Sequence, residues 1–205
     1  MSAQQAYSEL TTIMKEIAVL NSCAGLLGWD QRTHMPRGGA KHRADQLGLI
    51  AGMVHEKFTS PRIGELLAQV EGSDVVKTYD SVEAANVREI RRRYDRQTKL
   101  PKTLVEELVK TTSISETEWE TARAKSDFKK FAPWLEKVVA LTKQVADCYG
   151  YKGEPYNALL DDYEPGMTVE EISTVFEKLR VDLVELNGKI RNGKKRPKAE
   201  IITRS

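Results

Sequence analysis

The sequence predicts an all-α protein of about seven helices, several of them long, packed as an antiparallel helical array. Apolar residues recur at spacings of three and four along almost the whole chain, which is the period of an amphipathic helix. Strand-like alternation persists beyond four residues only at 199–203, a segment that is short and polar. A composition of 40% hydrophobic and 30% charged residues is typical of a globular chain and not of a fibrous or disordered one.

Two helices are expected in the first 60 residues. The first is long and ends at Gly28, and the second starts after Gly39 and continues to Phe58. Met35–Pro36 predicts a rigid loop between them, because proline fixes its own backbone φ. The inner faces comprise Leu10, Ile13, Ile17, Leu20, Ala24 and Leu27 in the first helix and Ala44, Leu47, Ile50 and Val54 in the second.

Three further helices are expected between residues 60 and 125. Ser60 and Pro61 provide an N-cap and a first-turn proline for a short helix. Residues 72–74 end that helix and cap a long fourth one, which carries Val75 and stops near residue 100. A fifth helix covers about 102–125.

The last two expected helices flank the longest expected loop, 151–167. Residues 126–128 predict a break and a new cap, and a sixth helix follows Pro133 and ends at Gly150. Thr168 and Glu171 form a capping box, in which each side chain can bond the other residue's backbone amide. This pair predicts the start of a seventh helix, which is expected to end at 187–188.

The charge of the chain is uneven along its length. The net charge is +2, yet residues 188–205 alone hold seven basic residues and one acidic residue. We therefore expect a mildly acidic helical domain over 1–187, followed by a basic tail over 188–205 that is poorly ordered or displaced.

A cytoplasmic location is expected, with no membrane partner. The N-terminus lacks a basic segment followed by an apolar one, and no uninterrupted apolar run approaches the ~20 residues that span a bilayer. Cys23 and Cys148 lie far apart within apolar helical patterns, so buried reduced thiols are favoured over a disulfide.

Metal ligation is not indicated by the histidines. His34, His42 and His55 are separated by eight and thirteen positions, so no two lie on one helical face as a zinc-binding i, i+4 pair does. His55–Glu56 resembles the start of a His-Glu-x-x-His motif, but position 59 is Thr. A structural or solvated role is favoured for each histidine.

The acidic residues of the long loop allow two interpretations. Asp161, Asp162 and Glu164 could form an acid–base pair, since crowded carboxyl groups shift each other's pKa. The favoured interpretation is structural: the aspartates end a short helical turn and residues 164–166 make the next turn. No nucleophile motif or phosphate-binding loop provides another route to catalysis.

A basic stripe on the fourth expected helix also allows two interpretations. Arg88, Arg92, Arg96 and Lys99 recur at spacings of three and four, and could attract an anion or nucleic acid. A solvated or acid-paired face is favoured, and the basic tail lacks aromatic residues that could stack on bases. Nucleic-acid binding is therefore not expected.

The segment around Gly28 is the most informative one. Trp29 directly follows a glycine that is expected to end a helix, and is predicted to pack as a lid on the core. Asp30 is predicted to cap the following turn.

This segment and others in the same order resemble the N-terminal portion of the carboxypeptidase Taq family of metallocarboxypeptidases. The resemblance covers nearly the whole chain, including residues 86–94, 100–101, 119–133 and 155–166. The signature residues for which it implies a structural or cleft-lining role are Trp29, Asp30, Met35, Pro36, Gly39, Arg43, Tyr163, Glu164, Pro165 and Gly166.

The resemblance implies an all-helical, usually dimeric, cytosolic enzyme that removes C-terminal residues from peptides with one zinc or cobalt ion. In the family, the two metal-binding histidines, the catalytic glutamate and a third, glutamate ligand follow the region matched here. No His-Glu-x-x-His occurs in this sequence. No catalytic or metal-binding residue is therefore carried over, and no cofactor is expected in this chain.

The leading hypothesis is an N-terminal cleft-wall portion of a metal-dependent carboxypeptidase, inactive alone and binding peptide only in the complete enzyme. The alternative is a non-enzymatic helical module that pairs with a full-length homologue or another protein. Either way, the first and seventh helices are expected to expose apolar stripes. Such stripes would promote self-association or binding to a missing C-terminal part.

Overall fold

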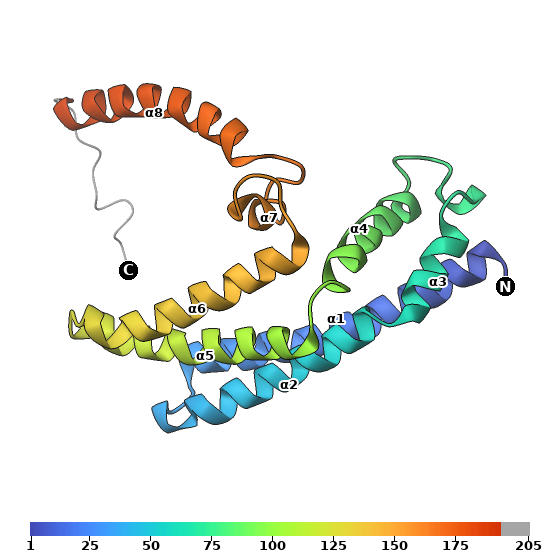
Figure 1. The fold of residues 1–205 in the computed structure, drawn as a ribbon, viewed down its shortest axis with the longest axis horizontal. Helices are drawn as coiled ribbons and strands as arrows, with labels where there is room; N and C mark the ends of the chain where they lie inside the picture. Colours follow the sequence, from blue (N-terminus) through green and yellow to red (C-terminus); the bar gives the residue numbers. More distant parts are fainter. Residues whose placement is uncertain (194–205) are drawn as a thin grey trace. The chain divides into compact units, whose positions relative to one another are not determined.

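The computed structural model describes residues 1–193, which form helices and turns without a strand in that range (Figure 1). The predicted all-α class is confirmed. The elements in order are α1 (Ala3–Thr33), the 3₁₀ helix η1 (Arg37–Gly39), α2 (Ala40–Phe58), α3 (Pro61–Val70), the 3₁₀ helix η2 (Asp74–Val76), α4 (Val82–Gln97), α5 (Lys102–Ala124), α6 (Phe128–Tyr149), α7 (Tyr156–Leu160) and α8 (Val169–Asn192).

The chain divides into two compact units, the first over Met1–Gly150 and the second from Tyr151 onward. In the first unit α2 packs against α1 and α5, α5 also packs against α6, and α3 packs between α1 and α4. The predicted division into 1–187 and 188–205 stays a prediction, and residues 194–205 lie outside the described part of the chain.

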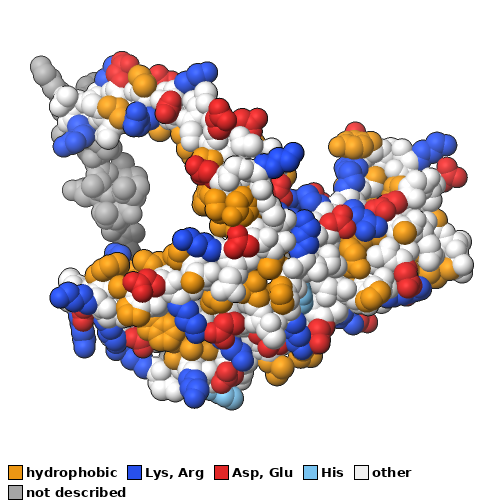
Figure 2. Space-filling view, viewed as in Figure 1, with side chains coloured by type: hydrophobic (Ala, Val, Ile, Leu, Met, Phe, Trp, Pro, Cys, Tyr) orange, Lys and Arg blue, Asp and Glu red, His pale blue; other side chains and the backbone are white. Residues whose placement is uncertain are grey.

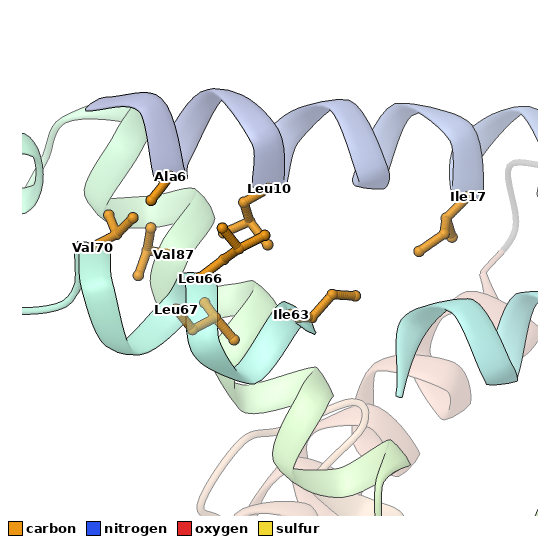
Figure 3. Close-up of a cluster of buried hydrophobic side chains, with 8 residues drawn as sticks. All are labelled: Ala6, Leu10, Ile17, Ile63, Leu66, Leu67, Val70 and Val87. Atoms are coloured by element: carbon orange, nitrogen blue, oxygen red, sulfur yellow. The ribbon is translucent and has the colours of Figure 1, made fainter. Parts of the chain in front are cut away.

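The core of the first unit is formed where α3 crosses the N-terminal half of α1. Ser60 caps α3 by accepting a hydrogen bond from the Arg62 amide, and Pro61 occupies the first turn, as the sequence predicts. Four of the ten residues of α3 are buried, so one full face of this helix is covered. The side chains that meet in this cluster are Ala6, Leu10, Ile17, Ile63, Leu66, Leu67, Val70 and Val87 (Figure 3).

The contact between α2 and α5 depends on small residues. A Cβ atom added to Gly48 would lie 2.5 Å from Cε of Lys110, so glycine allows the α5 side chain to lie across α2. Ion pairs lie beside this contact: Lys102 Nζ is 2.9 Å from Glu56 Oε1, and Lys110 Nζ is 3.7 Å from Asp45 Oδ1. The two helices therefore approach closely through glycine and are joined at their edges by charge.

Two predicted helix ends at the N-terminal side are wrong. The first helix does not end at Gly28 but continues to Thr33, because a glycine inside a helix costs only about 1 kcal/mol. The fourth helix begins at Val82 and not near Val75. Ser81 caps it by accepting a hydrogen bond from the Ala84 amide, and a separate 3₁₀ turn contains Val75.

Further boundaries differ at the C-terminal side. The sixth helix starts at Phe128, before Pro133, because Asp127 accepts a hydrogen bond from the Lys130 amide and caps it there. The expected loop 151–167 contains the short helix α7. The last helix passes through Gly188 to Asn192, five residues beyond the expected end.

The second unit is organised by side chains that bond to the backbone. Asn157 of α7 donates to the Lys152 carbonyl and accepts from the Val169 amide at 2.8 Å, which joins α7 to the start of α8. The predicted capping box is confirmed: the Glu171 amide donates to Thr168 Oγ1, and the Thr168 amide donates to Glu171 Oε2.

The two cysteines are not fully buried, contrary to the prediction. Cys23 is exposed and not buried, Cys148 is half-buried, and both thiols are free.

By length and composition, α1 is apolar enough to cross a bilayer although it contains no uninterrupted apolar run of that length. One such helix is weak evidence for a membrane span, since a core helix of a soluble protein meets the same criterion of length and composition.

Leu66→Ala should lower the free energy of unfolding by about 2–5 kcal/mol, because Leu66 is fully buried and its truncation leaves a cavity. Chemical denaturation followed by circular dichroism measures this loss. Leu49→Ala is the matched control, since Leu49 is exposed on α2 and should change stability by less than about 0.5 kcal/mol. Equal losses in the two variants would contradict the assigned core.

The stability of the α5–α6 contact should fall in acid. Lys137 Nζ lies 2.6 Å from Glu107 Oε1, and this hydrogen bond lowers the pKa of Glu107, while burial opposes the shift. A carboxyl group with a lowered pKa in the folded state adds stability above its unfolded pKa of about 4.3 and loses it as the pH falls further. Glu107→Gln should therefore flatten the decline of stability below about pH 4.3, whereas Glu120→Gln, an exposed change on the same helix, should not.

Candidate functional site

Arg43 joins the two helices that flank the turn at η1. Its Nη2 donates to Asp30 Oδ2 at 2.5 Å, its Nη1 donates to the Leu27 carbonyl, and its Nε donates to Gln46 Oε1 at 3.0 Å. The Arg43 side chain is 11% exposed, so these charge-assisted bonds are largely shielded from water. The guanidinium group therefore fixes the start of α2 against the last turns of α1. We call these four residues the Arg43 clamp.

Asp30 acts differently from the prediction. Its carboxylate binds Arg43 and does not cap the following turn. The turn is instead closed by the Asp30 backbone carbonyl, which accepts from the amides of His34 and Met35, each at 2.9 Å. The capping prediction was wrong because α1 continues through this position, which leaves the carboxylate on the helix surface facing α2.

Trp29 is not a lid on the core. It lies within α1 and is 53% exposed, with its ring edge-to-face against His34 at a centroid distance of 5.2 Å. The lid prediction was wrong for the same reason as the helix end, since a residue inside α1 points outward at this position of the helical turn. A large aromatic side chain that is half in solvent provides a surface for contact with other groups.

The turn between α1 and α2 contains the next signature residues. Met35 packs beneath Gly39, where an added Cβ atom would lie 3.2 Å from Met35 Cγ. Pro36 precedes η1 in an extended conformation, and the Gly39 amide donates to its carbonyl at 2.8 Å. The structure thus brings Asp30, Met35, Pro36, Gly39 and Arg43 together in one corner.

Two polar links to α5 hold the same corner and were missed by sequence reasoning. Gln31 Nε2 donates to the Ser113 carbonyl at 3.1 Å, and Ser113 Oγ donates back to Gln31 Oε1 at 2.9 Å. Arg32 forms two hydrogen bonds with the Glu116 carboxylate. These links depend on the continuation of α1 past Gly28 to Thr33, which brings Gln31 and Arg32 within reach of α5. The sequence prediction ended the helix at Gly28 and therefore missed them.

The other signature segment, Tyr163 to Gly166, lies in the second unit and follows α7. Gly166 has a φ of +83°, and its amide donates to Asp161 Oδ1 at 3.0 Å. The Met167 amide donates to the Glu164 carbonyl. This supports the structural interpretation of the loop carboxylates, while Tyr163 is 83% exposed and extends into solvent.

The histidines do not provide a metal site. His55 is buried in α2, and its Nε2 carries a hydrogen toward the Leu100 carbonyl at 2.9 Å, which is a structural role. His34 contacts Trp29, and His42 is exposed. No group of three or more His, Cys, Asp or Glu side chains suited to a metal ion occurs within residues 1–193. The described residues therefore do not fit a zinc or cobalt ion.

The basic stripe on α4 is largely engaged with other groups. Arg92 Nε lies 3.7 Å from Glu89 Oε2, and Lys99 Nζ donates a hydrogen bond to the Tyr149 carbonyl at 3.0 Å. The Arg96 guanidinium lies over the Tyr149 ring, 3.9 Å from its centroid. Arg88 stacks over the Tyr79 ring at 4.0 Å. Acidic and basic side chains alternate on the face shown in Figure 2. These contacts with Glu89, Tyr79 and Tyr149 favour a face engaged within the chain over a nucleic-acid surface.

One known protein family matches almost the whole chain. The family described as Carboxypeptidase Taq (M32) metallopeptidase matches residues 9–205. The chain belongs to this family. The resemblance of the signature segments is thereby confirmed at the level of the family.

Named relatives of the M32 family agree with this assignment. The chain is 40% identical to thermostable carboxypeptidase 1 of Thermus thermophilus over 213 residues, which cover 100% of this chain and 42% of the relative. It is 30% identical to carboxypeptidase 1 of Bacillus subtilis over 96% of this chain and 39% of the relative. The chain thus spans about two fifths of the length of these M32 proteins.

Solved M32 structures share the fold. The crystal structure of BsuCP matches 98% of this chain and 40% of its own with a TM-score of 0.85 and 29% identity. The structure of the Pyrococcus furiosus carboxypeptidase matches 94% of this chain and 38% of its own with a TM-score of 0.74 and 32% identity. The arrangement of helices is therefore that of part of an M32 carboxypeptidase.

Arg43→Ala should lower the free energy of unfolding by about 2 kcal/mol, because it removes three hydrogen bonds of a mostly buried cation. Denaturant titration measures the change. Arg37→Ala is the control, since Arg37 is exposed in η1, and it should cost less than about 0.5 kcal/mol. If Arg43→Ala were as well tolerated as the control, the Arg43 clamp would not be holding α2 to α1.

Proposed function

We propose that this chain forms a wall of the substrate cleft in a metal-dependent carboxypeptidase that removes C-terminal residues from peptides. The observation that carries the proposal is the M32 match over residues 9–205, together with the 42% of the Thermus thermophilus relative that the chain covers. The zinc or cobalt ion and the catalytic groups would be supplied by the rest of the family fold. Alone, the chain is inactive.

In this function the residues of the chain shape and cover the substrate cleft, and they take no part in the chemical reaction. The Arg43 clamp sets the corner between α1 and α2, and the links from Gln31 and Arg32 hold that corner against α5. Trp29 stands exposed beside this corner. An aromatic surface on a rigid frame suits the wall of a peptide cleft, where contact area matters more than proton transfer.

A peptidase assay tests the inactivity of the chain. The purified chain should not cleave a peptide with a free C-terminus in the presence of zinc or cobalt, because no His-Glu-x-x-His is present to hold the metal. Full-length Thermus thermophilus carboxypeptidase 1 serves as the positive control. Turnover by the chain above a metal-free sample, or tight zinc binding in equilibrium dialysis, would refute the assignment of the reaction centre to another part of the fold.

A second candidate function is a non-enzymatic helical module that pairs with a full-length homologue or another protein. The specific observation in its favour is apolar exposure on α8 and on α1, where Val19 and Leu26 are each more than 60% exposed. Apolar surface of this extent marks an interaction site. The two functions differ in their partner's role, since the first requires that the completed assembly hydrolyse peptides.

A further inference from the structure

The last helix of the described residues is mostly exposed beyond its first turn. None of the 24 residues of α8 is buried, although it is a regular helix with a capping box at its start. Eight large apolar side chains on it are exposed: Val175, Phe176, Leu179, Val181, Leu183, Val184, Leu186 and Ile190. A helix of this length is only marginally stable by itself, so packing against another element would normally support it.

Most of these side chains form one continuous line. Six apolar residues follow one another at alternating spacings of four and three, the pattern with which one helix packs along another. We call this line the α8 seam; it comprises Ile172, Phe176, Leu179, Leu183, Leu186 and Ile190. It extends for about 27 Å along the helix. Val181 and Val184 are also exposed and apolar, but lie off the seam, about 180° and about 120° around the helix from it.

Charges beside the seam argue against pairing with a second copy. In an antiparallel pair with full overlap, Arg180 would face Arg180 of the other copy and Asp182 would face Asp182, so like charges would meet. In a parallel pair, Val175 would face Arg180 and Asp182 would face Asn187, and neither pairing joins opposite charges. The seam also spans fewer than three heptads, whereas a coiled coil is indicated by three or four.

We propose that the α8 seam is the docking surface for a helix from the part of the M32 fold that lies outside these 205 residues. This inference rests on the proposed function and names the partner that completes it. The relatives are more than twice as long as this chain, and the BsuCP structure matches 98% of it, so the family fold continues well beyond the region that contains α8. The docking helix carries a matching apolar line, an acidic residue opposite Arg180 and a basic residue opposite Asp182.

Co-expression tests the proposal. The chain is expressed with the separately tagged remainder of Thermus thermophilus carboxypeptidase 1, which follows the 42% of that protein matched here, and the two are purified together. A one-to-one complex in sedimentation velocity is expected. Leu183→Glu should weaken it at least about 100-fold, because a carboxylate would be forced into the apolar seam.

Val184→Glu is the matched control. It places the same charge one residue away on the same helix, at a side chain that is also exposed but lies off the seam. Its complex should bind within about three-fold of the unsubstituted chain, as expected for a surface change. Arg180→Glu should weaken binding by up to about five-fold, the range of an exposed ion pair. None of these three glutamate substitutions can disrupt a packed core, since α8 buries no residue. Circular dichroism checks that the helix content is unchanged.

Several outcomes would overturn the proposal: no complex with the unsubstituted chain, equal effects of Leu183→Glu and Val184→Glu, or a homodimer of the chain alone that Leu183→Glu dissociates. A peptidase assay of the complex with zinc or cobalt separates this inference from the proposed function. A seam-dependent complex without turnover would leave the docking surface in place and refute the cleft-wall function. An active complex that tolerates Leu183→Glu would do the reverse.

Discussion

The continuity of α1 through Gly28 is the constraint on which the first unit depends. The N-terminal half of this helix buries Leu10 in the core with α3, and its last turns carry Asp30, Gln31 and Arg32. These three residues bind α2 and α5 only because the helical turn places them in successive directions around one axis. A helix that ended at Gly28 would separate the core from the corner that holds the signature residues. One uninterrupted helix therefore fixes the position of the corner relative to the core.

Two helix starts that are set by side-chain caps were predicted correctly from the sequence, whereas the starts of α4 at Ser81 and α6 at Asp127 were placed wrongly. Ser60 with Pro61 and Thr168 with Glu171 determine the starts of α3 and α8, because a cap satisfies amides that no other group can reach. The incorrect boundaries at Gly28 and Pro133 each arose at a residue of low helix propensity that lies inside a helix. Gly28 was interpreted as an end, but the turns beyond it form contacts only in the folded chain, such as Gln31 with Ser113. Pro133 was interpreted as lying before a start, but the Asp127 cap sets that start at Phe128.

The resemblance named the residues of the corner at η1 but not their arrangement, and their role in a functional site stays a prediction. The resemblance identified Asp30 and Arg43, yet their ion pair spans thirteen positions and a turn, and helical periodicity says nothing about pairs across a turn. The exposure of Trp29 was wrongly predicted for the same reason, since the direction of a side chain depends on where the helix ends. The sequence therefore identified these residues but did not give the directions of their side chains.

The two units satisfy their apolar residues to different degrees, and this difference links the fold to the function. In the first unit α3 is buried against α1 and α4, so its apolar face is already used within the chain. In the second unit α8 is held at its start by Asn157 and the Thr168–Glu171 box, while its apolar line remains in solvent. Capping orders the first turn of a helix but contributes little to the turns beyond it, whereas burial of a seam would stabilise every turn at once. The α8 seam is therefore the apolar surface for which we propose a packing partner, whereas the apolar face of α3 already has one within the chain.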